Sequence, residues 1–262
     1  MSDAGFVAIV DDLHAERLVV ESVLAGLPGT LWDLPSPAEG WTLRDCVAHL
    51  AETDGSAARS ISPEHAQPAA EGEREGVLTP GQRLARSFTP AEVLAWYSEA
   101  NDRLLAALRG CRGDERLRWL DRQMSARSFV SMRIMEHWSH GLDILEAAGV
   151  QPIDTDRLRH VSHLGYLTRD FAFENRGLEP PATPLRLELV SPGGERWTWG
   201  PPDAPDRIFG PAGDFCRIVT QRIHLADTSL HAEGPHAAEF LSIAQAFAGP
   251  PGAGRPPRAS SL

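Results

Sequence analysis

Four segments in the first 150 residues carry apolar side chains at helical spacing, and this periodicity constrains the fold more than any other feature. The segments are residues 3–26, 41–55, 89–108 and 125–148. Thr89, Pro90 and Glu92 form the start signal of one helix, and Thr42 with Asp45 forms a second capping box. Helices of this length joined by turns predict an antiparallel four-helix bundle, in which facing side chains can build a site.

The pattern changes after residue 150. Residues 155–175 are expected to be helical, and alternating Leu, Arg and Glu over 185–199, around a Pro-Gly-Gly turn, predict a β-hairpin. Further on, we expect the segment 206–224 to form a helix entered at Pro211, followed by a strand over 226–234 and a helix over 236–249. The expected organisation is therefore an all-α domain over 1–150, a smaller α+β domain over 151–250 and a disordered tail over 251–262.

One further segment, residues 62–82, is rich in Pro, Glu and Gly and is expected to be a loop. The sequence leaves open whether this loop closes over a site.

The basic residues narrow the possible functions. All 25 are Arg, so a Walker A loop, a kinase lysine and a Schiff-base mechanism are excluded, since each needs a lysine amine. The net charge of −11 disfavours nucleic acid and anionic membranes as partners. No apolar run is long enough to span a bilayer, and the N-terminal segment carries acids where a signal peptide is basic. With three widely spaced cysteines, these features predict a cytoplasmic protein with reduced thiols.

The segment MEHWSHGLDIL concentrates titratable residues on a helix that should be buried. Glu136, His140 and Asp143 stack on one face because they lie four and three residues apart. His49 lies on the apolar side of another expected helix. Two histidines and one carboxylate suit an open Zn²⁺ site, or another divalent ion such as Fe²⁺, and Asp143 can fix the His140 tautomer. The alternative is a solvated helix face with a hydrogen-bonded core histidine.

These motifs resemble a known family. WTLRDCVAHL, followed about ninety residues later by MEHWSHGLDIL, is similar to the metal-binding bundle of the mycothiol-dependent maleylpyruvate isomerases, within the DinB-like superfamily. The segments WTWGPPDAPDRIFGPAGDFCRIVTQRIHLADT and AQAFAGPP look like an actinobacterial branch described only as metal-binding. This resemblance implies that His49, Glu136 and His140 are the metal ligands. It also implies a sterol-carrier-protein-like C-terminal domain, with Arg222 directed to a substrate carboxylate; the alternative for Arg222 is a surface ion pair.

Other polar candidates have weaker support. His137 can replace Glu136 as the partner of His140, although the family pattern favours Glu136. Cys46 lies one turn before His49 and is either a fourth ligand or small core filler. Arg127 and Arg133 are possible partners for a carboxylate of a sugar thiol, but the favoured interpretation is that both side chains are exposed at the surface.

The expected chemistry follows from the resemblance. The cofactors are a divalent metal, with zinc first, and mycothiol, whose thiolate would add to a small electrophilic, acidic substrate. Elimination of the thiol gives isomerisation, and its retention gives S-transfer. Two alternatives remain open: a thiol-independent metal hydrolase, and a non-catalytic, metal-dependent binder of small molecules. The substrate, the metal and the oligomeric state are not determined by the sequence.

Overall fold

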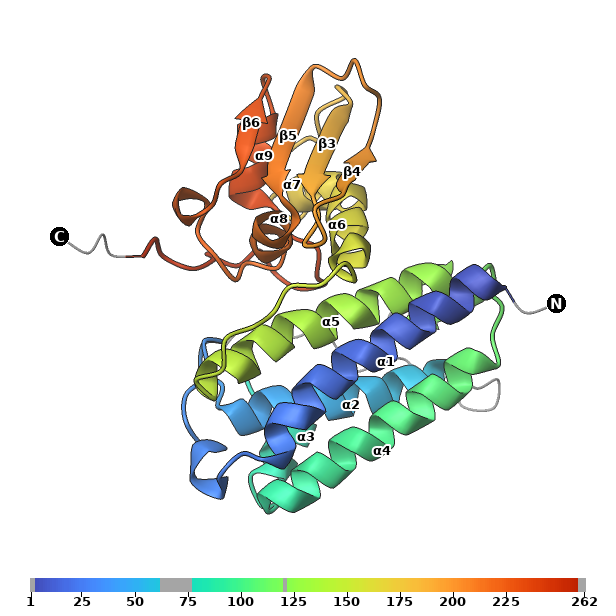
Figure 1. The fold of residues 1–262 in the computed structure, drawn as a ribbon, viewed down its shortest axis with the longest axis vertical. Coiled ribbons are helices and arrows are strands. Elements are labelled where there is room, and N and C mark those ends of the chain that lie inside the picture. The colour runs from blue at the N-terminus through green and yellow to red at the C-terminus, as the bar shows by residue number, and fades with distance from the viewer. Residues whose placement is uncertain (1–2, 62–76, 120–121, 259–262) are drawn as a thin grey trace. The chain divides into compact units, whose positions relative to one another are not determined.

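The computed structural model describes residues 3–61, 77–119 and 122–258. The chain divides into two compact units, Met1–Pro152 and Ile153–Leu262 (Figure 1). Each unit is described separately below.

The first unit is built mainly from four long helices that pack side by side (Figure 1). These helices are α1 (Ala4–Ala25), α2 (Leu43–Ile61), α4 (Pro90–Arg109) and α5 (Ala126–Ala147). Each of the four pairs α1 with α4, α1 with α5, α2 with α4 and α2 with α5 is in contact. The expected helical domain is thus confirmed, and its core is formed by the apolar faces of these helices, with Trp32, Leu50 and Tyr97 fully buried.

The helix boundaries follow the capping signals of the sequence. Thr89 accepts from the backbone N–H of Glu92, and the Glu92 side chain accepts from the backbone of Thr89, so both halves of that capping box are formed. Ser125 caps α5 through the N–H of Ser128. Such caps satisfy N–H groups that have no partner within the helix, and each typically contributes about 1 kcal/mol.

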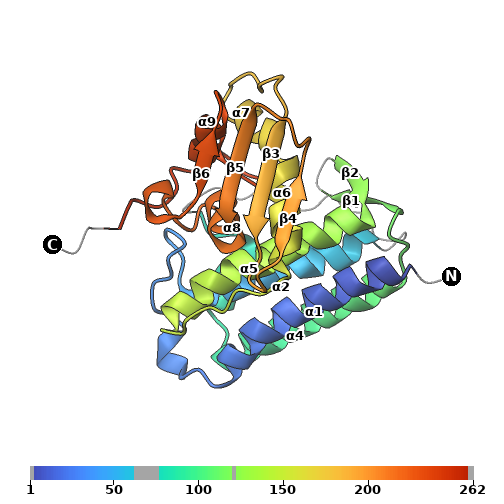
Figure 2. The ribbon, with the colours of Figure 1, turned by 45° about the horizontal axis from the view of Figure 1, so that its top comes forward.

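Two expectations for this unit are wrong in detail. Within the segment expected to be a loop, residues 62–76 lie outside the described residues, but a short helix, α3 (Pro80–Ala85), begins inside its end. Thr79 and Gln82 form a capping box there. The unit is also not purely helical, because β1 (Arg116–Trp119) and β2 (Arg122–Ser125) pair as an antiparallel hairpin just before α5 (Figure 2). A short arginine-rich run lacks the clear alternation that identifies a strand.

The second unit is α+β, as expected. Its sheet has the strand order β4–β3–β5–β6, with β3 and β5 parallel and the other pairs antiparallel. The strands are β3 (Leu185–Val190), β4 (Arg196–Trp199), β5 (Asp206–Pro211) and β6 (His231–Glu233). The helices are α6 (Leu158–Leu167), α7 (Arg169–Glu174), α8 (Ala212–Val219) and α9 (Ala237–Ile243), and a 3₁₀ turn, η2 (Leu225–Asp227), follows α8. Another 3₁₀ turn, η1 (Gly29–Leu31), lies between α1 and α2 of the first unit.

The predicted hairpin over 185–199 is confirmed, whereas the helix expected over 206–224 is two elements. Asp206–Pro211 is strand β5, and only Ala212–Val219 is helical. In β5 the side chains alternate between buried (Asp206 and Ile208) and partly buried (Arg207 and Phe209). The order Asp-Arg-Ile-Phe does not alternate in polarity, so the sequence lacked the usual strand signal. The last helix is also shorter than expected and ends at Ile243. Residues 251–258 have no regular structure, and 259–262 lie outside the described residues.

In the described part of the chain, no helix is both long enough and apolar enough to cross a bilayer.

The start of α2 is held by a buried carboxylate. Asp45 Oδ2 accepts from the Thr42 backbone N–H and hydroxyl, both at 2.9 Å, and Arg86 donates to both carboxylate oxygens at 3.2 and 2.8 Å. Burial by itself raises the pKa of Asp45, but the hydrogen bonds from Arg86 and Thr42 outweigh it and hold the pKa below its usual value. Asp45 is therefore ionised at neutral pH and fixes the helix that carries His49.

This lowered pKa predicts a pH-dependent contribution to stability. A carboxyl whose pKa is lower in the folded chain stabilises it fully above the unfolded value of about 3.9, and the contribution is lost as pH falls through the folded value. We expect Asp45→Asn to lower the free energy of unfolding at neutral pH, and the difference from wild type to shrink below about pH 4. Urea unfolding of wild type and variant between neutral pH and below about pH 4 measures this difference in the free energy of unfolding, and Asp203→Asn, at an exposed position, is the control. A pH-independent difference would contradict the ion-pair explanation.

Candidate metal centre

Helices α2 and α5 bring together His49, Glu136 and His140, which are called the triad below. One ligand atom from each residue lies within 4.8 Å of the other two. The Glu136 Oε2 atom is 3.5 Å from His49 Nε2 and 3.7 Å from His140 Nε2. His49 and His140 are buried, and the Glu136 side chain is 19% exposed. His49 precedes Glu136 by 87 residues and His140 by 91 residues, yet the fold brings the donor atoms of all three together.

The ring orientations of both histidines are fixed by their neighbours. His140 Nδ1 lies 3.2 Å from Asp143 Oδ2, so the Nδ1–H can donate to this carboxylate and the lone pair of Nε2 is directed to the triad. The Trp41 ring stacks on His140, with ring centres 5.5 Å apart, and contacts His49 at 5.2 Å. Asp143 is thus placed where the sequence predicts a residue that fixes the tautomer.

Electrostatics keep Glu136 ionised. Burial alone raises the pKa of this carboxyl, but the hydrogen bond from His49 and the positive charge of Arg133 outweigh it, and the pKa is lowered well below its usual value. An ionised carboxylate beside two imidazoles is a donor set that suits Zn²⁺ or Fe²⁺.

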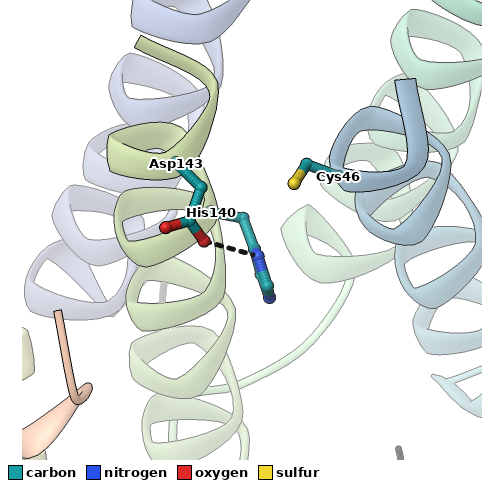
Figure 3. A group of neighbouring side chains, drawn as sticks. All are labelled: Cys46, His140 and Asp143. Atoms are coloured by element: carbon teal, nitrogen blue, oxygen red, sulfur yellow. Dashed lines mark ion pairs between the residues drawn. The ribbon is translucent and has the colours of Figure 1, made fainter. Parts of the chain in front are cut away.

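Cys46 belongs to a different set of neighbours. Its sulfur forms a group with His140 and Asp143, rather than with His49 and Glu136 (Figure 3). Cys46 is fully buried, and its thiol donates to Ser36 Oγ at 3.3 Å. The hypothesis that Cys46 is the fourth ligand of the triad therefore gains no support.

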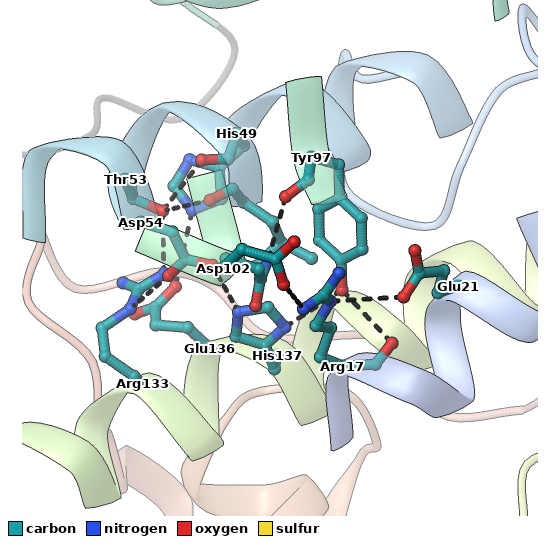
Figure 4. Close-up of polar contacts among 12 residues, drawn as sticks. Arg17, Glu21, His49, Thr53, Asp54, Tyr97, Asp102, Arg133, Glu136 and His137 are labelled. Carbon is teal, nitrogen blue, oxygen red and sulfur yellow. Dashed lines mark hydrogen bonds and ion pairs between the residues drawn. The ribbon is translucent and has the colours of Figure 1, made fainter. Parts of the chain in front are cut away.

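A second buried polar cluster, which the sequence did not reveal, lies beside the triad (Figure 4). Arg133 donates to Asp54 Oδ1 at 2.9 Å from Nε and at 2.6 Å from Nη2, and His137 Nε2 lies 2.7 Å from Asp54 Oδ2. Tyr97 Oη is 3.2 Å from His137 Nδ1. Arg133, Asp54 and His137 are all buried. The expected surface exposure of Arg133 is wrong, and both nitrogens of His137 face this cluster rather than the triad.

The cluster also contacts the metal centre through one hydroxyl. Arg133 Nη2 donates to Thr53 Oγ1 at 2.9 Å, and Thr53 Oγ1 donates to the backbone carbonyl of His49 at 2.8 Å (Figure 4). No local pattern could reveal this arrangement, because Asp54 and Arg133 are 79 residues apart.

The remaining candidates are distributed elsewhere. Arg127 forms a partly exposed ion pair with Asp3, which agrees with the prediction that its side chain lies at the surface. Arg222 lies in the second unit directly after Gln221, whose φ of 58° is in the left-handed region. The Arg222 guanidinium donates from Nη1 to the Thr220 carbonyl at 2.7 Å.

Comparisons with known proteins relate the chain to one family. A family model described as the mycothiol maleylpyruvate isomerase N-terminal domain matches residues 13–145, which span the triad. Uncharacterized proteins from two strains of Mycobacterium tuberculosis, CDC 1551 and H37Rv, are each 41% identical over 259 residues, covering 97% of this chain and all of theirs.

Solved structures extend the similarity to the fold. Crystal structures of the mycothiol-dependent maleylpyruvate isomerase and of a histidine-to-alanine mutant of it match with TM-scores of 0.57 and 0.58, at 18% and 17% identity. Both matches cover 88% of this chain and 96% of the solved chain. From the family model over half of its length, together with these relatives, the chain belongs to the mycothiol maleylpyruvate isomerase family.

Proposed function

We propose that this chain is a metal-dependent enzyme that uses a low-molecular-weight thiol, mycothiol, for isomerisation or S-transfer on a small, electrophilic and acidic substrate. The observation that carries the proposal is the convergence of His49, Glu136 and His140 within 4.8 Å, in a chain of this family. As part of the same proposal, the helical unit is a DinB-like four-helix bundle and the second unit is sterol-carrier-protein-like.

The spacing of the triad supports a cation rather than hydrogen bonds. Zinc has bonds of about 2.0–2.2 Å to nitrogen and oxygen in tetrahedral geometry, so two of its ligands lie about 3.4 Å apart. The Glu136 Oε2 atom is 3.5 and 3.7 Å from the two imidazole nitrogens, close to this separation; as hydrogen bonds, the contact with His49 is at the long limit and the contact with His140 is beyond it. Three protein ligands leave a fourth position for a thiol, which is the composition of catalytic zinc sites.

The residues of the chain have distinct tasks in this proposal. When bound, a divalent cation lowers the pKa of a coordinated thiol, so that the thiolate exists at neutral pH. Asp143 holds the Nδ1–H of His140 and keeps Nε2 available as a ligand. Trp41 restricts both imidazole rings, because it stacks on His140 and makes a tilted ring contact with His49.

Substrate recognition is assigned to Arg222. Its planar guanidinium can hold a carboxylate through two parallel hydrogen bonds and stabilise the negative charge that develops when a thiolate adds to a conjugated carbonyl compound. The backbone N–H of Arg222 donates to the Arg217 carbonyl at 2.7 Å, which closes the turn after α8 and orients this residue.

Metal content and thiol dependence test the proposal together. Elemental mass spectrometry on the purified protein should find about one equivalent of zinc or iron. Turnover of α,β-unsaturated carboxylic acids should require added mycothiol, and Arg222→Lys should raise KM more than it lowers kcat, because a single ammonium replaces a bidentate contact. Thiol-independent hydrolysis would support the hydrolase instead, and saturable ligand binding without turnover would support the binder.

Replacement of Asp143 tests how the chain orients His140. We expect Asp143→Asn to weaken zinc binding by about 10–100-fold, since the amide no longer attracts the Nδ1–H as a carboxylate does. Competition with a chromophoric chelator measures the affinity. Asp102→Asn, which changes a largely exposed carboxylate on α4, is the control. Equal zinc affinity in the two variants would show that Asp143 does not contribute to metal binding.

A further inference from the structure

The group formed by Cys46, His140 and Asp143 is a second set of possible metal ligands. One ligand atom from each of these residues lies within 4.8 Å of the other two. Cys46 reaches this point from α2, whereas His140 and Asp143 reach it from α5 (Figure 3). Cys46 and Asp143 are fully buried and His140 is 6% exposed, so these donors are held in a protected interior. Thiol, imidazole and carboxylate groups are each established ligands of zinc-like cations, and here all three are withdrawn from solvent.

This set shares only His140 with the triad. The two nitrogens of that ring face different neighbours: Nε2 lies 3.7 Å from Glu136 Oε2, and Nδ1 lies 3.2 Å from Asp143 Oδ2. Ligation by the triad uses Nε2 and keeps the proton on Nδ1. Ligation together with Asp143 uses Nδ1 and places the proton on Nε2, where Glu136 can accept it. The two sets therefore need opposite tautomers of the same neutral imidazole.

We propose that Cys46, His140 Nδ1 and Asp143 form a second site for a soft, thiophilic divalent cation, and that occupation of this site excludes occupation of the triad. Thiolate ligands select soft cations, whereas a set with two imidazoles and one carboxylate also accepts harder ones. The second site goes beyond the proposed function, because Cys46 and Asp143 are not members of the triad, whereas the mutual exclusion rests on the proposed function in that it takes the triad to bind a cation.

The two sites differ in proton balance. The triad contains no thiol, so at a pH well above the ordinary pKa values of imidazole and carboxyl groups, about 6.5 and 4.3, a cation that binds there displaces no proton. Binding at the second site converts the Cys46 thiol to a thiolate and releases one proton to solvent. The tautomer change of His140 moves a proton from Nδ1 to Nε2 and releases none. The expected signature is one proton per cation.

Cadmium is a suitable probe, because its bond to a thiolate has an ultraviolet charge-transfer absorption that imidazole and carboxylate ligands lack. Titration of the metal-free protein with Cd²⁺ should produce this absorption and release one proton per cation. In Cys46→Ser both signals should disappear, even where Cd²⁺ still binds through the triad. Cys111→Ser, which changes a half-buried thiol elsewhere in the helical unit, should leave both signals intact.

A variant of the triad separates this inference from the proposed function. Glu136→Gln should abolish thiol-dependent turnover yet keep the cadmium absorption, and adding Cys46→Ala to it should weaken Cd²⁺ binding by about tenfold or more. Mutual exclusion predicts one bound cation per chain when Zn²⁺ and Cd²⁺ are supplied together. Absence of the absorption in wild type, or its persistence in Cys46→Ser, would overturn the site. Two cations bound at once would overturn the exclusion.

Discussion

His140→Ala is expected to remove the bound divalent metal and to reduce thiol-dependent turnover to background. His140 supplies one of the three donors of the triad. An alanine at this position leaves two donors, His49 on α2 and Glu136 on α5. Loss of a group that hydrogen-bonds to a metal ligand lowers metal affinity by about 10–100-fold, so loss of the ligand itself should lower the affinity by more. The measurement is metal content by elemental mass spectrometry on wild type and variant purified in parallel.

Thermal unfolding adds a readout that needs no substrate. A cation that binds only the folded chain stabilises it by about 2.7 kcal/mol at a free concentration one hundred times its Kd, so added Zn²⁺ should raise the Tm of wild type but not of His140→Ala. His163→Ala, which removes an exposed histidine of α6, should behave like wild type. If His140→Ala retained a full equivalent of metal and the same zinc-induced shift, the triad would not be the metal site.

Asp54→Asn is expected to destabilise the folded chain by about 3–5 kcal/mol. Asp54 is fully buried and accepts two hydrogen bonds from Arg133, while its other oxygen lies 2.7 Å from His137 Nε2. Removing one partner of a buried ion pair leaves the other charge without compensation, and the amide cannot neutralise the Arg133 guanidinium. Urea unfolding of the metal-free protein at neutral pH measures the loss, provided that the m-value is unchanged.

An exposed pair on α4 provides the matched control for Asp54→Asn. Glu99 and Arg103 are four residues apart, and their side chains are 70% and 52% exposed. Because solvent screens such a pair, Glu99→Gln should change the free energy of unfolding by about 0.5 kcal/mol or less. If the two substitutions lowered the free energy of unfolding equally, or if Asp54→Asn had only a small effect, the buried cluster would stabilise the fold no more than a surface ion pair does.

The buried cluster also shows where prediction from local sequence ends. The sequence indicated that Arg133 lies on a helix near Glu136, but helical periodicity does not say which residue of another helix faces it. Arg133 is buried because Asp54, on α2, neutralises it and Thr53 accepts a further hydrogen bond from its Nη2. An isolated arginine is far more often exposed, so the local expectation followed the general tendency and was wrong here.

The helix starts and the grouping of the triad were predictable for different reasons. Caps and apolar periodicity are local, so the signals at Thr42, Thr89 and Ser125 predicted where α2, α4 and α5 begin. His49, Glu136 and His140 were grouped through their resemblance to a family, and their spacing alone left a solvated face as an alternative. The hairpin at 116–125 and strand β5 were missed, because short strands depend on partners distant in the sequence.

By itself, the sequence determined the elements that local energetics control: the capped helices of the first unit, the hairpin over 185–199, and the absence of any chemistry that needs a lysine amine. Only the tertiary structure decided which side chains meet. The packing of α2 against α5 sets the 3.5 Å separation between His49 and Glu136, and it buries the contacts that His140 makes with Glu136 and Asp143 along α5 itself. The physical reason is that burial, and pairing between groups on different helices, are properties of contacts between elements, which no single helix contains.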